Sequence, residues 1–202
     1  MAGTERYIAV GDIHGCPHQL EEILELGLAF PDHQWVFLGD YIDRGPDSES
    51  VVQILRRFHG IFLLGNHEDR LFDRLRSASP IERQQWLDFT GLSETSLGWL
   101  TQIPVPCWDT DSYLFVHDAD DKDLTSKWVV HGHHSLREPL IVGNRVNINT
   151  SCGAGGPLTA VVLPEFLFLQ SSHSPHDRTE SALEIDLAAL VDETLEELEG
   201  EG

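Results

Sequence analysis

Basic residues, cysteines and long apolar runs are all scarce in this sequence of 202 residues. Only 13 lysines and arginines stand against 34 acidic residues, which gives a formal net charge of −21. Such a surface repels a phosphate backbone, so we expect no binding to duplex nucleic acid. No apolar run approaches the roughly 20 residues that a membrane-spanning helix needs, so we expect no membrane association.

The three cysteines are an odd number at unrelated spacings, which argues against a disulfide framework. The first residues lack a basic segment followed by an apolar one, the pattern of a secretory signal peptide. We therefore expect a cytoplasmic protein. The length suits one well-filled domain, and the sequence makes no prediction of the oligomeric state.

Strand-like and helix-like segments alternate in the first two-thirds of the chain. The pattern predicts strands at 7–10, 35–38 and 61–64, and helices at 17–27, 46–58, 68–77, 81–89 and 93–100. Short strands follow at 113–116, 128–131, 140–142, 145–148, 159–163 and 166–169, joined by turn-rich links. We therefore expect an α/β fold (an α+β sandwich) of two stacked, mixed β-sheets flanked by helices.

One catalytic domain is predicted over residues 1–170. Residues 171–202 read as a polar linker and an acidic C-terminal segment with apolar residues at helical spacing and, from residue 180 on, no basic residue. An acidic helix without chemistry is the preferred interpretation of this segment. A helix that mediates self-association or binds a partner is the alternative.

Glycine-framed polar motifs follow the first three predicted strands. They are Gly11–Gly15 (GDIHG), Gly39–Gly45 (GDYIDRG) and Gly65–Glu68 (GNHE). In open α/β sheets, ligands bind at the carboxyl ends of the strands, so these motifs should converge on one crevice. His117 and His133 follow two later strands and are expected to reach the same place.

The convergent residues form a candidate site for two divalent metal ions. Asp12 and His14 are two positions apart, so on an extended backbone they point to the same side and can bind one ion. Asp40 could give a carboxylate oxygen to each ion. The mixture of carboxylate, amide and imidazole groups favours manganese first, with iron, zinc, cobalt or nickel as alternatives. The predicted metal ligands are Asp12, His14, Asp40, Asn66, His117 and His133.

Three neighbouring residues are candidates for catalysis. His67 could act as a general acid toward the leaving oxygen, and Asp43 could hold it in the correct tautomer. Arg44 offers a planar fork that can hold two phosphate oxygens, with Asn66 as a second substrate-binding group. The expected nucleophile is a metal-bound hydroxide. Each motif alone could be an ordinary turn, but their joint occurrence after successive strands indicates a catalytic site.

These three motifs match the signature of the phosphoprotein phosphatase (PPP) family of metallophosphoesterases. The turn and strand at residues 149–160 resemble the bacterial, lambda-phage-type serine/threonine phosphatase branch, and the similarity runs from about Arg6 to Leu169. The resemblance implies a calcineurin-like metallophosphoesterase fold. It also implies a metal-dependent phosphatase for phosphomonoesters, with phosphoserine or phosphothreonine in proteins as the first expectation and a small phosphoester as the other substrate.

Two other activities remain open at this point. One is hydrolysis of dinucleoside polyphosphates such as diadenosine tetraphosphate. The other is a non-catalytic role in which the chain binds a phosphorylated partner without turnover.

The sequence departs from the family pattern after the metal histidine. Asp118 stands where the family usually has a small residue, and the short stretch between His117 and His133 lacks the arginine that commonly helps to hold phosphate. Lys122, Lys127, Arg137 and Arg145 are the candidates to replace it. His131 and His134 flank His133 and are expected mainly to orient neighbours or face solvent.

Overall fold

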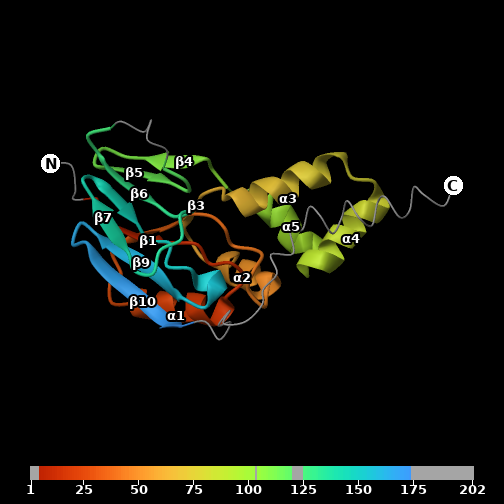
Figure 1. The fold of residues 1–202 in the computed structure, drawn as a ribbon, viewed down its shortest axis with the longest axis horizontal. Helices are drawn as coiled ribbons and strands as arrows, with labels where there is room; N and C mark the ends of the chain where they lie inside the picture. Colours follow the sequence, from red (N-terminus) through yellow and green to blue (C-terminus); the bar gives the residue numbers. More distant parts are fainter. Residues whose placement is uncertain (1–4, 103, 120–124, 174–202) are drawn as a thin grey trace.

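Two five-stranded β-sheets with helices beside them make up the fold (Figure 1). The computed structural model describes residues 5–102, 104–119 and 125–173. The first sheet has the strand order β10-β9-β1-β2-β3. β1 is parallel to β2 and β2 to β3, whereas β9 runs antiparallel to both β1 and β10. Its strands are β1 (Tyr7–Val10), β2 (Gln34–Phe37), β3 (Ile61–Phe62), β9 (Pro157–Leu163) and β10 (Leu167–His173).

The second sheet has the strand order β4-β5-β6-β8-β7. β5, β6 and β8 are parallel, and the antiparallel strands β4 and β7 form its two edges. The carboxyl ends of β5 and β6 lead to His117 and His133. The strands are β4 (Cys107–Asp109), β5 (Tyr113–Val116), β6 (Trp128–His131), β7 (Leu140–Val142) and β8 (Arg145–Asn147).

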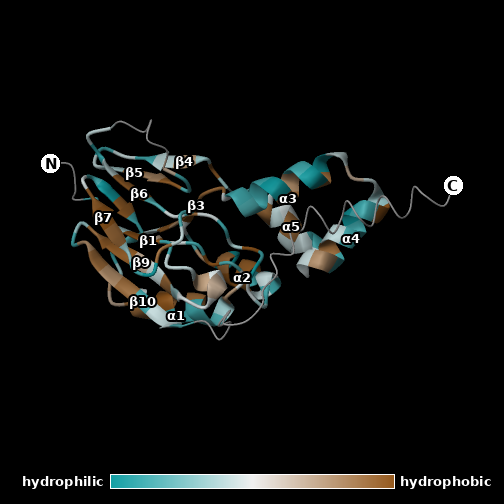
Figure 2. Ribbon diagram, in the orientation of Figure 1, coloured by the Kyte–Doolittle hydropathy of each residue, from teal (hydrophilic) through white to brown (hydrophobic). Residues whose placement is uncertain are grey.

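The first sheet lies between two apolar cores, because successive side chains of a strand point to opposite faces. On β1, Ile8 and Val10 are buried in the core shared with the helices, whereas Ala9 lies in the core shared with the second sheet. On β9, Val162 and Val161 divide in the same way. Figure 2 shows the resulting apolar colouring along these strands. Burial on both faces fixes the strand ends that carry the polar motifs.

Two helices cover the outer face of the first sheet, and three others extend away from the sheets (Figure 1). The covering helices are α1 (Pro17–Gly27) and α2 (Ser48–Leu55), which pack against each other. The helical lobe consists of α3 (Asn66–Ser77), α4 (Pro80–Thr90) and α5 (Glu94–Leu100), and α5 contacts α2. A short 3-10 helix, η1 (Cys152–Ala154), precedes β9.

The predicted α/β fold of two mixed sheets flanked by helices is confirmed. Two helices, α2 and α3, differ from their predicted bounds by two residues or more at an end. α2 is shorter than the predicted 46–58 at both ends, and at its start Asp47 caps the first turn by accepting a hydrogen bond from the Ser50 N–H at 2.8 Å. α3 begins at Asn66 rather than at residue 68. Asn66 and His67 therefore lie in the first helical turn.

The predicted strands also differ at their ends, with β3 two residues shorter and β9 two residues longer, and the largest differences are at β4 and β10. β4 was not predicted, because all three of its side chains are exposed at a sheet edge and show no apolar alternation. β10 spans Leu167–His173 and so extends four residues past the predicted strand end at residue 169. Its backbone there is held by Glu22 of α1, whose carboxylate accepts a hydrogen bond from the Ser172 N–H at 2.6 Å.

The predicted acidic C-terminal helix and Lys122 lie outside the described residues. Among the helices that these residues form, none is long and apolar enough to cross a membrane.

Candidate metal centre

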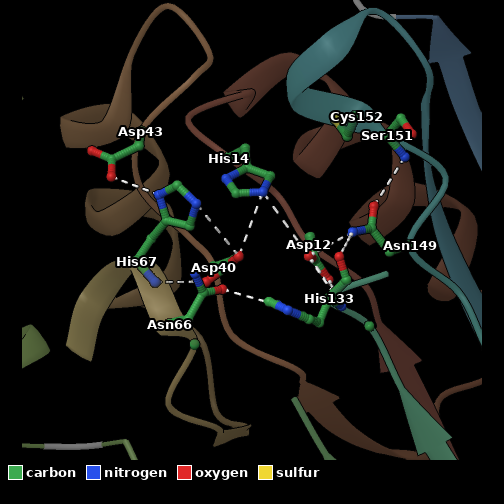
Figure 3. Close-up of polar contacts among 12 residues, drawn as sticks. Asp12, His14, Asp40, Asp43, Asn66, His67, His133, Asn149, Ser151 and Cys152 are labelled. Atoms are coloured by element: carbon green, nitrogen blue, oxygen red, sulfur yellow. Dashed lines mark hydrogen bonds and ion pairs between the residues drawn. The ribbon is translucent and has the colours of Figure 1, made fainter. Parts of the chain in front are cut away.

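The ends of five strands bring the predicted site residues together (Figure 3). Asp12 and His14 follow β1, Asp40 follows β2, and Asn66 opens α3 just after β3. His117 and His133 arrive from β5 and β6 of the second sheet. The site therefore lies where the two sheets present the carboxyl ends of their parallel strands.

Asp40 is at the centre of two overlapping groups that could each hold a metal ion. In the first group, Asp40 Oδ2 lies 3.6 Å from His14 Nε2 and 3.9 Å from His67 Nε2. In the second, Asp40 Oδ1 lies 3.5 Å from His117 Nε2, and His133 completes the group. The two oxygens of Asp40 thus face different groups, as a bridging carboxylate requires.

Asn66 and Asp12 extend these two groups. One amide atom of Asn66 lies 3.0 Å from His117 Nε2 and 3.1 Å from His133 Nδ1. Asp12 Oδ2 lies 4.0 Å from His14 Nε2. All six predicted metal ligands are therefore neighbours in the structure.

The chemistry of this donor set fits divalent cations. Backbone carbonyls fix two of the imidazole rings, since Nδ1 of His14 donates to Ile42 O at 3.1 Å and Nδ1 of His117 to Leu38 O at 2.9 Å. Each ring therefore turns an unprotonated Nε2 toward the carboxylates. Burial lowers the pKa of His14 to about 4 and also lowers that of His117, so both are neutral at pH 7. Lone pairs of imidazole nitrogens and carboxylate oxygens thus point into one space. A cation bound there would stabilise this arrangement.

The backbone is strained at these positions. Five site residues have a φ between 47° and 68°, a left-handed conformation that is uncommon outside glycine. Such strain concentrates at functional sites, where the surrounding structure must maintain it. The five are His14, Asp40, Asp43, Arg44 and His133.

Two glycines allow the second half of the chain to approach the first motif. A Cβ at Gly132 would collide with the carboxylate of Asp12. A Cβ at Gly153, in η1, would lie 2.6 Å from Cβ of His14 and 3.0 Å from Cβ of Arg44. The glycine-rich turn is therefore part of the wall of the site.

His67 and Asp43 form a closely paired dyad. His67 Nδ1 lies 2.7 Å from Asp43 Oδ2, while His67 Nε2 faces Asp40 (Figure 3). This contact is the one predicted between the two residues. It fixes the ring so that Nε2 points into the site, where it could donate a proton or contact a metal ion.

Arg44 lies beside the metal ligands on an exposed loop. Its Cβ lies against Gly153, the same glycine that approaches the Cβ of His14. The predicted phosphate-binding position of Arg44 is thus next to the first group of ligands. Lys127 is engaged elsewhere, because its Nζ lies 2.6 Å from Asp109 Oδ1.

Glu68 has a structural role that the sequence did not reveal. Its fully buried carboxylate accepts hydrogen bonds from the N–H groups of Asp40 at 2.9 Å, Tyr41 at 2.8 Å and Ile42 at 3.2 Å. These contacts fix the loop that carries Asp40. The GNHE motif was the available signal, although it gave no indication of this partner.

Asn149 is a second residue whose role was missed. Its Nδ2 donates to Asp12 Oδ2 at 2.7 Å and to the His133 carbonyl at 3.0 Å (Figure 3). It thereby joins a predicted metal ligand of the first sheet to one of the second. The position lies within the glycine-rich segment used for the family resemblance, but no local pattern indicates the contact.

Asp118 replaces the usual small residue without entering either metal group of the described residues. Its oxygens lie 3.7 Å from His133 Nε2 and 3.3 Å from His134 Nε2. His134 thus faces Asp118, and the ring of the buried His131 contacts the Gly132 carbonyl at 3.2 Å. Neither histidine belongs to the two metal groups found among the described residues.

The fold and this donor set define a metal-dependent phosphoesterase. The family described as calcineurin-like phosphoesterase matches residues 5–167. The chain belongs to this family.

Similarity to curated proteins follows two patterns. A bis(5'-nucleosyl)-tetraphosphatase PrpE [asymmetrical] from Oceanobacillus iheyensis is 27% identical, with 79% of this chain and 89% of that protein covered. A PrpE from Halalkalibacterium halodurans is 25% identical, with 79% and 91% covered. A serine/threonine-protein phosphatase PP2A-like PPG1 from Candida albicans is 45% identical over 67 residues, which are 30% of this chain and 16% of that protein.

A solved structure supports the fold. A crystal structure assigned as a diadenosine tetraphosphatase superimposes with a TM-score of 0.70 at 21% identity, covering 86% of this chain and 95% of that one. This likeness establishes the expected calcineurin-like fold.

Proposed function

We propose that this chain hydrolyses a phosphoanhydride bond of a dinucleoside polyphosphate of the diadenosine tetraphosphate type. The observation that carries the proposal is the extent of the similarity. The PrpE relatives match about four-fifths of this chain and about nine-tenths of their own length. The motifs alone favoured a phosphoprotein substrate, but a similarity over the whole domain also includes the surfaces that select a substrate.

The geometry supports hydrolysis at a phosphorus atom. Two divalent ions, when bound, would polarise the phosphoryl group and activate the attacking water. Asp12, His14 and Asp40 would hold one ion. The other would share Asp40 and be completed by Asn66, His117 and His133.

The chain's own groups position and protonate the substrate. Arg44 presents a guanidinium fork that can hold two oxygens of the transferring phosphoryl group. His67, held by Asp43 at 2.7 Å, can donate a proton from Nε2 to the leaving oxygen. A nucleotide leaving group needs less protonation than an alkoxide. His67 should therefore contribute less to anhydride hydrolysis than to cleavage of an alkyl ester.

A serine/threonine protein phosphatase is the second candidate. The PP2A-like match supports it, since its 45% identity exceeds that of the PrpE relatives. That match covers only 30% of this chain, so it reports mainly on a shared catalytic segment.

A substrate panel with added manganese tests these alternatives. We expect the highest kcat/KM with diadenosine tetraphosphate, compared with a phosphothreonine peptide and p-nitrophenyl phosphate, and ATP plus AMP as products by chromatography. Asp40→Ala is the control for contaminating hydrolases. Faster phosphate release from the peptide would favour the second candidate. A protein that binds two ions but turns over none of the three would support the non-catalytic interpretation.

A further inference from the structure

Arg70 lies next to the metal centre, although the sequence offered no reason to place it there. It follows Asn66 by four residues on α3, so the two side chains occupy one face of the helix. The outer amide atom of Asn66 lies 2.6 Å from Arg70 Nη2. The inner amide atom faces His117 and His133. The exposed guanidinium is therefore one amide group away from the second set of metal ligands.

The Asn66 amide has two possible orientations, which differ in whether its NH2 group or its oxygen points inward to the histidines. With NH2 inward, it donates to His117 Nε2 at 3.0 Å and to Asp40 Oδ2 at 3.1 Å, and its outward oxygen accepts from Arg70. With oxygen inward, the form that can bind a cation, the outward NH2 meets the guanidinium donor to donor. Arg70 must then leave this position. The ligand form of Asn66 therefore frees the exposed Arg70 side chain to bind another partner beside the centre.

Other basic groups are less well placed for this role. Lys127 pairs with Asp109 at 2.6 Å. Lys127 precedes β6 and Arg145 begins β8, so both lie at the amino ends of parallel strands. The metal ligands follow the carboxyl ends. Arg137 is exposed on the loop after His134 and serves below as a comparison.

We propose that Arg70 is a substrate-binding residue that holds the non-reacting phosphates of a polyphosphate substrate. It would supply the second guanidinium that is absent between His117 and His133. This inference rests on the proposed function, since a polyphosphate substrate can offer one phosphate to Arg44 and another to Arg70. A guanidinium fork suits such a chain because it can hold two phosphate oxygens at once.

Binding of methylenebisphosphonate, a non-hydrolysable analogue of diphosphate with a P–C–P bridge, tests Arg70 without catalysis. Calorimetry on the manganese-loaded protein would compare Arg70→Ala and Arg70→Lys with Arg74→Ala. Arg74 is a matched control one turn further along α3, where its guanidinium stacks 4.6 Å from the Trp86 ring. We expect Arg70→Ala to weaken binding about tenfold, as the loss of a charge-assisted phosphate contact implies, and Arg70→Lys to be intermediate. Arg74→Ala should bind like the wild type.

Kinetics and metal analysis complete the test. For diadenosine tetraphosphate, Arg70→Ala should raise KM by a similar factor with a smaller change in kcat, and the rise for p-nitrophenyl phosphate should be lower. Manganese per chain should equal that of the wild type. The inference is overturned if Arg70→Ala binds the diphosphonate like Arg74→Ala, if Arg137→Ala shows the loss instead, or if Arg70→Ala loses manganese.

Failure of the proposed function gives a different result. A wild-type protein that does not cleave diadenosine tetraphosphate, but binds methylenebisphosphonate in an Arg70-dependent way, would reject the dinucleotide substrate. The phosphate-binding role of Arg70 would stand.

Discussion

The floor and the rim of the metal centre differ in how firmly they are held. The floor, here Asp12, His14 and Asp40, is at most 3% exposed, and each residue has a fixed hydrogen-bond partner. The rim, here Arg44 and Arg70, is exposed. Buried ligands with fixed partners suit chemistry that a whole family shares. An exposed rim can change with less cost to the fold, so it is where we place substrate preference.

Removing Asp40 should have the largest effect, because both candidate metal groups contain it. Asp40→Ala should abolish turnover and leave well under two ions per chain in elemental analysis. A variant that retained two ions and a near-normal rate would show that Asp40 is not the bridge.

The next largest effect should come from His67. His67→Asn should keep both metal ions and slow hydrolysis of alkyl phosphates by roughly 10²–10⁴-fold, the usual contribution of general acid–base catalysis. The loss should be smaller with p-nitrophenyl phosphate and with diadenosine tetraphosphate, whose leaving groups depart more readily. An equal loss with all substrates would instead indicate that His67 positions the substrate. Loss of a metal ion would indicate that His67 is a metal ligand.

Arg44 tests the rim directly. Arg44→Ala should raise KM strongly and also lower kcat, by about 10²-fold in kcat/KM, because the fork should also stabilise the transferring phosphoryl group. Lys127→Ala is the control, since this lysine is paired with Asp109. An Arg44→Ala variant with unchanged kinetics would mean that another group clamps the phosphate.

Asp12 tests how much the buried acidic residues of the floor destabilise the metal-free protein. Burial and the charge of Asp40 raise the pKa of Asp12 well above its usual 3.8, so the folded protein favours the neutral carboxyl. The contribution of the neutral Asp12 carboxyl to the stability of the metal-free protein is therefore fully present below pH 3.8. It is lost as the pH rises through the pKa of Asp12 in the folded state.

Asp12→Asn should therefore raise the urea midpoint of the metal-free protein near pH 7, on the order of 1 kcal/mol in the free energy of unfolding. The same substitution should weaken manganese binding. Asp47→Asn, at the cap of α2, is a comparison variant away from the ligands. A metal-free Asp12→Asn protein that is less stable at pH 7 would contradict the expected cost.

The smallest effect should come from long-range charge. With a net charge of −21, the surface repels an anionic substrate, and moderate salt screens that repulsion. Activity should therefore rise modestly with salt, mainly through KM. Steady inhibition across a sodium chloride titration would instead point to a basic clamp sensitive to screening.

The residues that form the floor of the site could be predicted from the sequence. Each ligand motif is only a few residues long and follows a strand with a clear apolar pattern, so its position at a strand end could be predicted locally. The same patterns predicted two mixed sheets with helices beside them. The metal type and the substrate were not determined, because related family members share these motifs.

The contacts that support the floor, and the position of Arg70 on the rim, follow only from the folded structure. Asn149 meets Asp12 across 137 residues, and Glu68 holds a loop 26 to 28 residues away, so neither contact leaves a local pattern. Arg70 was missed for a different reason. The predicted helix began at residue 68, whereas Gly65 caps α3 without a side chain and the helix starts at Asn66. Only that earlier start places Arg70 one turn from Asn66, where side chains four residues apart can touch.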